Sequence, residues 1–213
     1  MPEVDAPSAV PLEVAAFDFD GTLTRRDTLL PFLWHGLGWP RFLFALLRSG
    51  LWLAAYAVGL TSNHKAKARL LHAALAGLPE AELARWTEKF VTDYLPWQWQ
   101  PVLKARLAHH QQLGHRCVIV SASPGIYLHQ VGLLLGMDGV ICTEMETRNG
   151  VLTGWLATPN CHGEEKVRRL RVWLTGNHGE RPVVLHAYGD SSGDVPLLNL
   201  ADYAWYRGQP RAH

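Results

Sequence analysis

Short apolar runs that each end in a polar residue recur along the chain, and helical patterns separate them. Strands that alternate with helices are typical of parallel βαβ units. A further apolar run at 140–142 has the length and composition of a core strand. The pattern predicts an α/β fold with a parallel sheet flanked by helices. The runs and the polar residues that follow them are 14–17 with Asp18, 118–120 with Ser121, and 183–189 with Asp190.

The alternation of strands and helices stops between Pro31 and about Pro101, where apolar residues recur with helical spacing. Two helix faces stand out, one formed by Leu70, Leu71, Ala74 and Leu75 and the other by Leu83, Trp86, Phe90 and Tyr94. A helical block between two strands predicts an insertion into the sheet domain. We therefore expect a discontinuous core domain at 12–30 and 100–207 and an inserted helical domain at 31–99.

A hairpin is expected around Asn149-Gly150, a pair that favours a tight turn between two strands. The flanking strands would be 143–148 and 151–155, and we expect the hairpin to pack on the edge of the core. Both ends of the chain, 1–11 and 208–213, are expected to be poorly ordered.

The composition limits the classes of function that the chain can have. A chain of 213 residues with 48% hydrophobic residues has room for one core domain and a modest insertion. Twenty Lys+Arg residues against 19 Asp+Glu leave no overall field that favours nucleic acid, so we expect no nucleic-acid partner. Residues 1–5 carry neither the basic nor the apolar segment of a signal peptide, which favours a cytoplasmic location.

The cysteines and the clustered histidines do not form a recognisable metal site. The three cysteines lack CxxC and zinc spacing, and an odd count suits inert thiols in a reducing cytoplasm. The histidines precede a predicted strand, and we interpret them as a solvated helix end. These residues are Cys117, Cys142 and Cys161, and His109, His110 and His115.

Residues 42–60 are strongly apolar and raise the question of a membrane. At 1.5 Å per residue, a helix of this length would span about 28 Å, close to a bilayer core. Arg48 lies near its first third, however, and a central arginine costs about 2.5–3.5 kcal/mol on insertion scales. Because a buried helix can be apolar all round, we favour helices of the inserted domain over a membrane span. A peripheral contact with lipid through 42–60 stays open.

Asp18 and Asp20 stand where the first predicted strand enters a turn that Gly21 permits. Mg²⁺ prefers oxygen ligands and keeps several waters, so one or two carboxylates and a phosphate oxygen are enough to bind it. The alternative is that these acids only solubilise a strand end or cap a helix. Open parallel sheets bind ligands beyond the carboxyl ends of their strands. We therefore expect Asp18, Ser121 and Asp190 to meet in one crevice.

Four motifs resemble those of the haloacid dehalogenase (HAD) superfamily, subfamily IB, the branch that includes phosphoserine phosphatases and phosphatidylglycerophosphatase C. They occur in the family's order and span most of the chain. The resemblance implies a Rossmann-like core and an inserted helical cap of the C1 type at 31–99. The motifs are DFDGTLT at 18–24, VSAS at 120–123 with its Ser121, GEEKV at 163–167 with its Lys166, and GDSSGD at 189–194.

The resemblance also implies roles for individual residues. Asp18 would be the nucleophile that forms an aspartyl-phosphate, and Asp20 the general acid and base. Lys166 would place a positive charge beside the nucleophile. Mg²⁺ is the implied cofactor, with the Asp18 side chain, the Asp20 backbone carbonyl, Asp190 and Asp194 as implied ligands. Implied substrate contacts are Ser121, Ala122, Thr22 and Asp27.

Simpler readings of three of these residues stay open. Ser121 could cap the helix that follows it, and Asp194 could cap the helix through 196–198. Lys166 could be an ordinary surface lysine, although cations favour the other end of a helix.

Three positions depart from the phosphoserine phosphatase pattern and weaken the case for that substrate. Gly193 stands where those enzymes commonly carry asparagine, Asp27 stands where they place a glutamate, and Ser121 is not followed by two glycines. We therefore expect a Mg²⁺-dependent phosphomonoester hydrolase that acts on a small phosphorylated metabolite, phosphoserine-like, or on a lipid head-group phosphate. The alternatives are a phosphotransferase with the same intermediate and a membrane-associated phosphate-binding module without turnover. The sequence does not indicate the oligomeric state.

Overall fold

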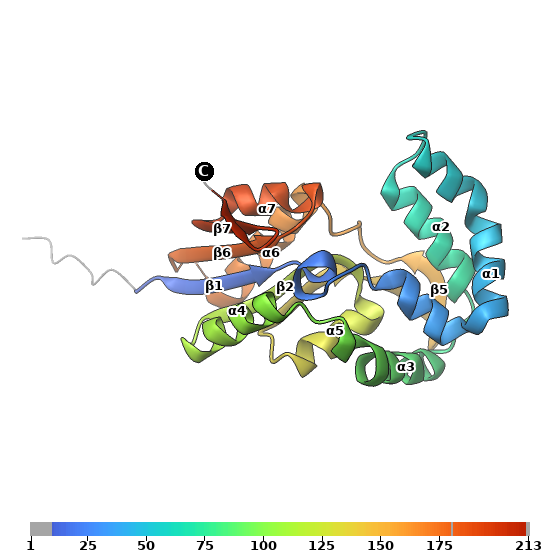
Figure 1. Cartoon of the computed structure of the whole chain (residues 1–213), viewed down its shortest axis with the longest axis horizontal. Coiled ribbons are helices and arrows are strands. Elements are labelled where there is room, and N and C mark those ends of the chain that lie inside the picture. The colour runs from blue at the N-terminus through green and yellow to red at the C-terminus, as the bar shows by residue number, and fades with distance from the viewer. Residues whose placement is uncertain (1–9, 180, 212–213) are drawn as a thin grey trace, which may run out of the picture.

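Six strands form one sheet in the order β3-β2-β1-β6-β7-β8 in the computed structural model, which describes residues 10–179 and 181–211 (Figure 1). Neighbouring strands run parallel except β7 and β8, which are antiparallel. The expected parallel α/β sheet is confirmed. The strands are β1 Leu12–Phe17, β2 Arg116–Pro124, β3 Gly139–Thr143, β6 Val183–Gly189, β7 Tyr203–Tyr206 and β8 Gln209–Arg211.

Helices cover both faces of the sheet, which is why its central strands are apolar on both sides. Along β1, Val14 and Ala16 pack in one apolar cluster with α6 and α7, while Ala15 and Phe17 pack in the other with α4 and α5. This alternation follows from the two-residue period of a strand. The helices are α4 Pro101–Gln112, α5 Gly125–Leu134, α6 Glu164–His178 and α7 Val195–Leu200.

Helices also fill the predicted insertion. They are α1 Leu29–Ala57, α2 Asn63–Leu75 and α3 Glu80–Lys89, followed by short helical turns at Phe90–Tyr94 and Leu95–Trp97. The chain leaves the core and returns to it at one point, where Thr24 and Trp99 form an isolated antiparallel bridge. The division into a core at 12–30 and 100–207 and a cap at 31–99 stays a prediction.

Helix α1 bends at Gly38, whose φ of 70° is outside the helical range. Pro40 follows and has no backbone N–H to continue the hydrogen-bond ladder. Gly50, which is a weak helix former, lies inside the second half of the helix without interrupting it. Residues 42–60 therefore belong to α1 and the turn after it. No helix in the described ranges combines the length and the apolar content needed to cross a bilayer.

The hairpin forms as expected, from β4 Met145–Arg148 and β5 Val151–Leu156, but its predicted position is wrong. It joins the cap instead of the core edge, and Figure 1 shows β5 beside α2. The Leu152 N–H donates to the Leu78 carbonyl at 2.9 Å, and the Gly77 N–H donates to the Leu152 carbonyl at 2.9 Å. A Cβ on Gly154 would come within 2.8 Å of the His72 Cα, so glycine allows this close packing.

The C-terminal segment also differs from expectation. Residues 209–211 form β8 on the edge of β7, so the prediction of disorder from 208 onward is wrong for them. Residues 1–9 and 212–213 lie outside the described part of the chain, as does the segment read for a signal peptide. The three cysteines are free and buried, and burial raises the pKa of Cys117 to about 12 and that of Cys161 to about 11. Protonated thiols of this kind are unreactive.

Candidate active site

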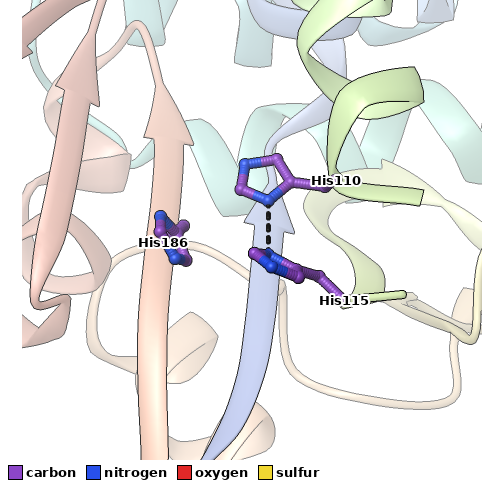
Figure 2. A group of neighbouring side chains, drawn as sticks. All are labelled: His110, His115 and His186. Carbon is purple, nitrogen blue, oxygen red and sulfur yellow. Dashed lines mark hydrogen bonds between the residues drawn. The ribbon is translucent and has the colours of Figure 1, made fainter. Parts of the chain in front are cut away.

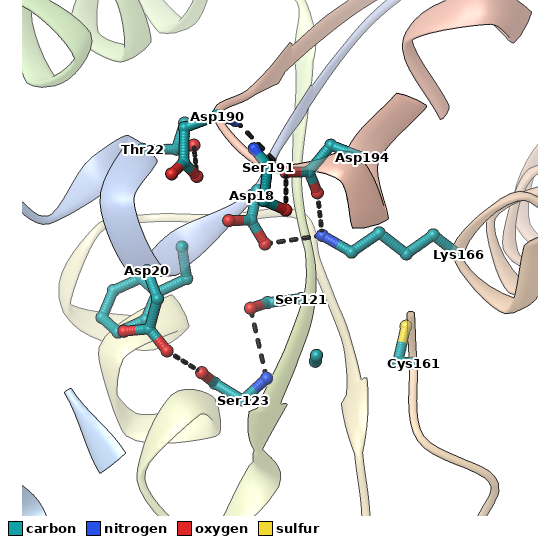
Figure 3. Close-up of polar contacts among 12 residues, drawn as sticks. Asp18, Asp20, Thr22, Ser121, Ser123, Cys161, Lys166, Asp190, Ser191 and Asp194 are labelled. Atoms are coloured by element: carbon teal, nitrogen blue, oxygen red, sulfur yellow. Dashed lines mark hydrogen bonds and ion pairs between the residues drawn. The ribbon is translucent and has the colours of Figure 1, made fainter. Parts of the chain in front are cut away.

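Acidic side chains from separate parts of the chain meet at the carboxyl ends of β1 and β6, which are neighbours in the sheet (Figure 3). One oxygen of each of Asp18, Asp190 and Asp194 lies within 4.8 Å of the others. Asp18 is fixed from behind, because its N–H donates to the Tyr188 carbonyl at 2.9 Å. The expected meeting of Asp18 with Asp190 is therefore present in the structure.

Lys166 joins two of these carboxylates. Its Nζ donates to Asp18 Oδ1 at 2.6 Å and to Asp194 Oδ1 at 2.5 Å, and the residue is only 2% exposed. Burial alone would lower the pKa of Lys166, but Asp18 and Asp194 raise it above its ordinary value, so the ammonium stays charged. Lys166 is therefore part of the site, and the reading as a surface lysine is wrong.

The carboxylate cluster carries more negative charge than one lysine neutralises. Burial raises the pKa of Asp18 to about 6 even though Lys166 opposes the shift. Burial and the nearby Asp194 also raise the pKa of Asp190. Hard carboxylate oxygens that lack a full complement of positive charge suit Mg²⁺, which takes oxygen ligands. The donor set therefore fits the expected cofactor.

Asp194 also organises the loop after β6. Its Oδ2 accepts hydrogen bonds from the Asp190 N–H at 3.2 Å, the Ser191 N–H at 2.9 Å and the Ser191 hydroxyl at 2.7 Å. Together with Ser191 it forms a capping box on the short helical turn Ser192–Asp194. Burial opposes ionisation, but Lys166 and these donors lower the pKa of Asp194 below its ordinary value. Asp194 stands at the N-cap position of α7, but its side chain makes no cap hydrogen bond there, so the reading of Asp194 as a cap of that helix is wrong. The metal-ligand role of Asp194 stays a prediction.

The turn after β1 lies in close contact with the Asp190 side chain. Gly21 has a φ of 78°, and a Cβ on it would lie 2.3 Å from Asp190 Oδ2. Only glycine can adopt this φ without strain and also leave room for the Asp190 carboxylate. The Thr22 hydroxyl donates to Asp190 Oδ1 at 3.1 Å, so it orients a predicted metal ligand. The substrate contact expected of Thr22 stays a prediction.

The Asp20 side chain points away from Lys166 toward Ser123 (Figure 3). Its Oδ1 accepts from the Thr28 N–H at 2.9 Å and the Thr28 hydroxyl at 2.6 Å, and its Oδ2 accepts from the Ser123 hydroxyl. Burial and the neighbouring Asp27 raise the pKa of Asp20 to about 7. A carboxyl group with this pKa exists in both protonation states near neutral pH, as a general acid–base requires. Metal contact through the Asp20 carbonyl stays a prediction.

The three remaining predicted contacts line the same cavity of about 760 Å³ as Asp18 and Lys166. The Ser121 hydroxyl accepts a hydrogen bond from the Ser123 N–H at 3.2 Å. The N-cap position of α5 is occupied by Pro124, and no side chain caps the helix there. The reading of Ser121 as a helix cap is therefore wrong. Substrate binding by these residues stays a prediction. They are Ser121, Ala122 and Asp27.

Lys67 of α2 also lines this cavity, and the sequence did not single it out. Its Nζ donates to the Ala122 carbonyl at 2.5 Å, which connects the cap to the end of β2. Burial lowers the pKa of Lys67. Lys67 precedes Leu70 and Leu71 by three and four residues and so lies on their buried helix face. The signal available in the sequence was a lysine on an otherwise apolar helix face.

Acids at the ends of parallel strands and a buried lysine lie beside one cavity, which residues of the helical cap also line. The family model of haloacid dehalogenase-like hydrolases matches residues 15–199. Protein CicA of Caulobacter vibrioides is 34% identical over 201 residues, which cover 92% of this chain and 88% of CicA. The chain therefore belongs to the haloacid dehalogenase-like hydrolases. The expected family and fold class are confirmed, and the enzyme class is confirmed as a hydrolase of this family.

Solved structures agree with this fold. A Bordetella pertussis protein of unknown function is similar with a TM-score of 0.78 at 25% identity, over 92% of this chain and 89% of that one. A phosphoserine phosphatase containing an analogue of the phospho-aspartyl intermediate is similar with a TM-score of 0.63. At 16% identity, over 92% of this chain and 86% of the other, this second likeness shows the fold alone.

Replacing Lys166 with methionine tests its electrostatic role. We expect Lys166→Met to lower the free energy of unfolding in Mg²⁺-free buffer by about 3–5 kcal/mol, because it leaves buried carboxylates without their partner. The exposed Lys65 provides the matched control, and Lys65→Met should change stability by no more than about 0.5 kcal/mol. Urea unfolding measures both variants. Equal stability of the two would show that the Lys166 ion pairs do not hold the site together.

Proposed function

We propose that the chain is a Mg²⁺-dependent phosphomonoester hydrolase that works through an aspartyl-phosphate on Asp18. The observation that carries the proposal is the convergence of Asp18, Asp190, Asp194 and Lys166 from three separate segments beside one cavity. The solved phosphoserine phosphatase with an analogue of its phospho-aspartyl intermediate has the same fold and supports this chemistry.

In the first half-reaction, an Asp18 carboxylate oxygen attacks the phosphorus atom of the ester. The bond between phosphorus and the ester oxygen breaks, and the departing oxygen takes the proton of Asp20. Thr28 and Ser123 hold the Asp20 carboxyl in place for this transfer. The products of the step are a free alcohol and phosphorylated Asp18.

In the second half-reaction, a water molecule attacks the same phosphorus atom, and the ionised Asp20 takes its proton. The bond between phosphorus and the Asp18 oxygen breaks, which releases inorganic phosphate and restores both acids. Lys166 keeps Asp18 oriented and stabilises negative charge on the phosphoryl oxygens, and Ser121 donates a hydrogen bond to one of them. Mg²⁺ held by Asp18, the Asp20 carbonyl and Asp190 would offset the repulsion between carboxylate and phosphate.

Replacement of Asp18 tests the nucleophile. We expect Asp18→Asn to lower turnover of an aryl phosphate by at least about 10³-fold, because the amide cannot form the intermediate. Asp93→Asn, at an exposed position of the cap, should retain wild-type turnover. EDTA should abolish wild-type activity and added Mg²⁺ should restore it. Retained activity of Asp18→Asn, with both variants folded by circular dichroism, would refute the assignment.

The two alternatives differ from hydrolysis in their products. A phosphotransferase would pass the phosphoryl group from Asp18 to an added alcohol, so phosphate release would fall as the new ester appeared. A phosphate-binding module would bind phosphate without releasing any product. Release of one inorganic phosphate per substrate consumed, unchanged by an acceptor alcohol, separates hydrolysis from both.

The outer surface of α1 favours a lipid phosphate as substrate over a free metabolite. Leu53 and Tyr56 of this helix line the active-site cavity, so the cavity entrance and the helix surface are continuous. Large apolar side chains project from the same helix, and exposed apolar patches of this kind mark interaction surfaces. They include Trp39, Phe44, Leu47 and Leu51, which are 60%, 60%, 72% and 87% exposed.

Charge on the cap points to an anionic bilayer as the surface that α1 meets. Residues 28–79 contain no Asp or Glu. The same segment contains Arg41, Arg48, Lys65, Lys67 and Arg69. Basic residues beside exposed apolar side chains are typical of helices that lie on anionic lipid. We therefore propose peripheral contact through 42–60 and a phosphate monoester on a lipid head group as substrate. A cytoplasmic location remains our expectation.

Vesicles separate the two kinds of substrate. We expect Leu51→Asp to lower turnover of a lipid phosphate monoester in anionic vesicles by about 10-fold or more, since burying one leucine contributes about 1.5–3 kcal/mol. Leu133→Asp, on the 82% exposed Leu133 of α5, is the matched control and should not change this rate. Turnover of a soluble aryl phosphate should be the same in both variants. If phosphoserine is hydrolysed faster than the lipid, and Leu51→Asp has no effect, the substrate is a soluble metabolite.

A further inference from the structure

Three histidines meet on the face of the sheet that α4 covers (Figure 2). His110 lies in the last turn of α4, His115 directly precedes β2, and His186 lies in β6. One ring nitrogen of each lies within 4.8 Å of the others. His186 precedes Asp190 by four residues, about 13 Å along a strand, and none of the three lines the active-site cavity.

The interpretation of these histidines as a solvated helix end is therefore wrong for two of them. His110 is 4% exposed and His115 is half-buried, while His109 is exposed as expected. The sequence could not reveal His186 as a partner, because only the order of strands brings β6 next to the end of α4.

His186 is arranged as a metal ligand with its outer partner in place. Its Nε2 lies 2.8 Å from Glu13 Oε2, and a carboxylate can only accept, so Nε2 carries the proton. That leaves Nδ1 with a lone pair, and this atom is buried with no hydrogen-bond partner in the described part of the chain. Metal-bound histidines commonly donate their second nitrogen to a carboxylate in this way.

His110 and His115 turn their Nδ1 atoms toward each other. The Nε2 of His110 lies 2.8 Å from the Tyr188 hydroxyl, which can accept a hydrogen bond from the ring N–H, and the Nδ1 of His110 lies 2.9 Å from His115 Nδ1. Two nitrogens this close share one proton at most. A cation that displaced this proton would find two lone pairs converging on it.

Burial keeps the His110 and His115 rings neutral, which is the form that ligates metals. Burial lowers the pKa of His110 to about 4 and also lowers the pKa of His115. The charged groups that face the cluster are Glu13 of β1 and Arg106 of α4, whose guanidinium lies over the Trp205 ring. Ring stacking of His186 on Tyr203, with centroids 4.9 Å apart, closes the side next to β7.

We propose that His110, His115 and His186 bind a divalent transition-metal ion of the zinc class through their Nδ1 atoms. Imidazole suits Zn²⁺, Co²⁺ and Ni²⁺ rather than Mg²⁺, so this site and the carboxylate site select different metals. Two nitrogens on one tetrahedral Zn²⁺ lie about 3.3 Å apart. The His110–His115 separation of 2.9 Å needs to widen by a few tenths of an ångström, and the half-buried His115 and His186 rings can turn to meet the ion.

The site would join three elements that are distant in sequence. A metal that binds only the folded state stabilises it by mass action, so Zn²⁺ should raise the unfolding temperature. The inference does not depend on the proposed phosphatase reaction, because it uses none of the residues in that mechanism.

The Zn²⁺ affinity of purified variants tests the site. It is measured by competition with a chromophoric chelator, and excess Mg²⁺ is present so that the carboxylate site is already occupied. We expect wild-type protein to bind one Zn²⁺ that Mg²⁺ does not displace, and the Co²⁺ form to show ligand-field absorption. His115→Gln should weaken Zn²⁺ binding by more than the 10–100-fold range expected for Glu13→Gln, which removes only the outer partner. His109→Gln, the neighbouring exposed histidine, should bind as the wild type does.

Asp190→Asn separates this site from the active site. We expect the variant to retain the Mg²⁺-resistant Zn²⁺ and its effect on the unfolding temperature. Three results would each overturn the proposal: no Mg²⁺-resistant Zn²⁺ in the wild type, unchanged affinity in folded His115→Gln, or loss of the tight Zn²⁺ in Asp190→Asn alone. His115 is half-buried rather than buried, so its replacement should leave the fold intact, and circular dichroism checks this.

Discussion

The buried ion pairs of Lys166 with Asp18 and Asp194 are the interaction on which the site depends. Carboxylates removed from water at the ends of two adjacent strands repel one another, and the buried ammonium of Lys166 opposes this repulsion. The parallel sheet imposes this crowding, because β1 and β6 are neighbours and both end at the same edge. A divalent cation therefore matches the negative charge that the fold leaves uncompensated. Other features of the site hold these charged groups in position, including the close turn at Gly21 and the capping box of Asp194.

Local sequence signals predicted the parts of the molecule that depend on local physics. The strands before Asp18 and Asp190 were visible because both of their faces are apolar, and the hairpin was visible because Asn149-Gly150 favours its turn. The docking of that hairpin on α2 depends on tertiary contacts of Leu152 and Gly154, which have no local signal. The short strand β8 likewise exists only because β7 offers it an edge.

In the candidate site too, some residues could be predicted from local sequence and others could not. Motifs in the expected order marked Asp18, Asp20, Lys166 and Asp190, and the structure brings their elements to one cavity. Lys67 was missed because it comes from the cap, whose position over the sheet is not encoded in any one segment. The His110 cluster was missed because it requires the strand order. Tyr188 connects the two sites, since its carbonyl accepts from the Asp18 N–H and its hydroxyl contacts His110 Nε2.

The most direct test of the central claim is a crystal structure of the protein with Mg²⁺ and beryllium trifluoride, a mimic of a phosphoryl group on a carboxylate. Convergence of the acids around one cation predicts beryllium bonded to an Asp18 oxygen, Mg²⁺ between Asp18 and Asp190, and Lys166 in contact with the fluorides. An adduct on another residue, or Asp190 turned away from a metal-free Asp18, would contradict it.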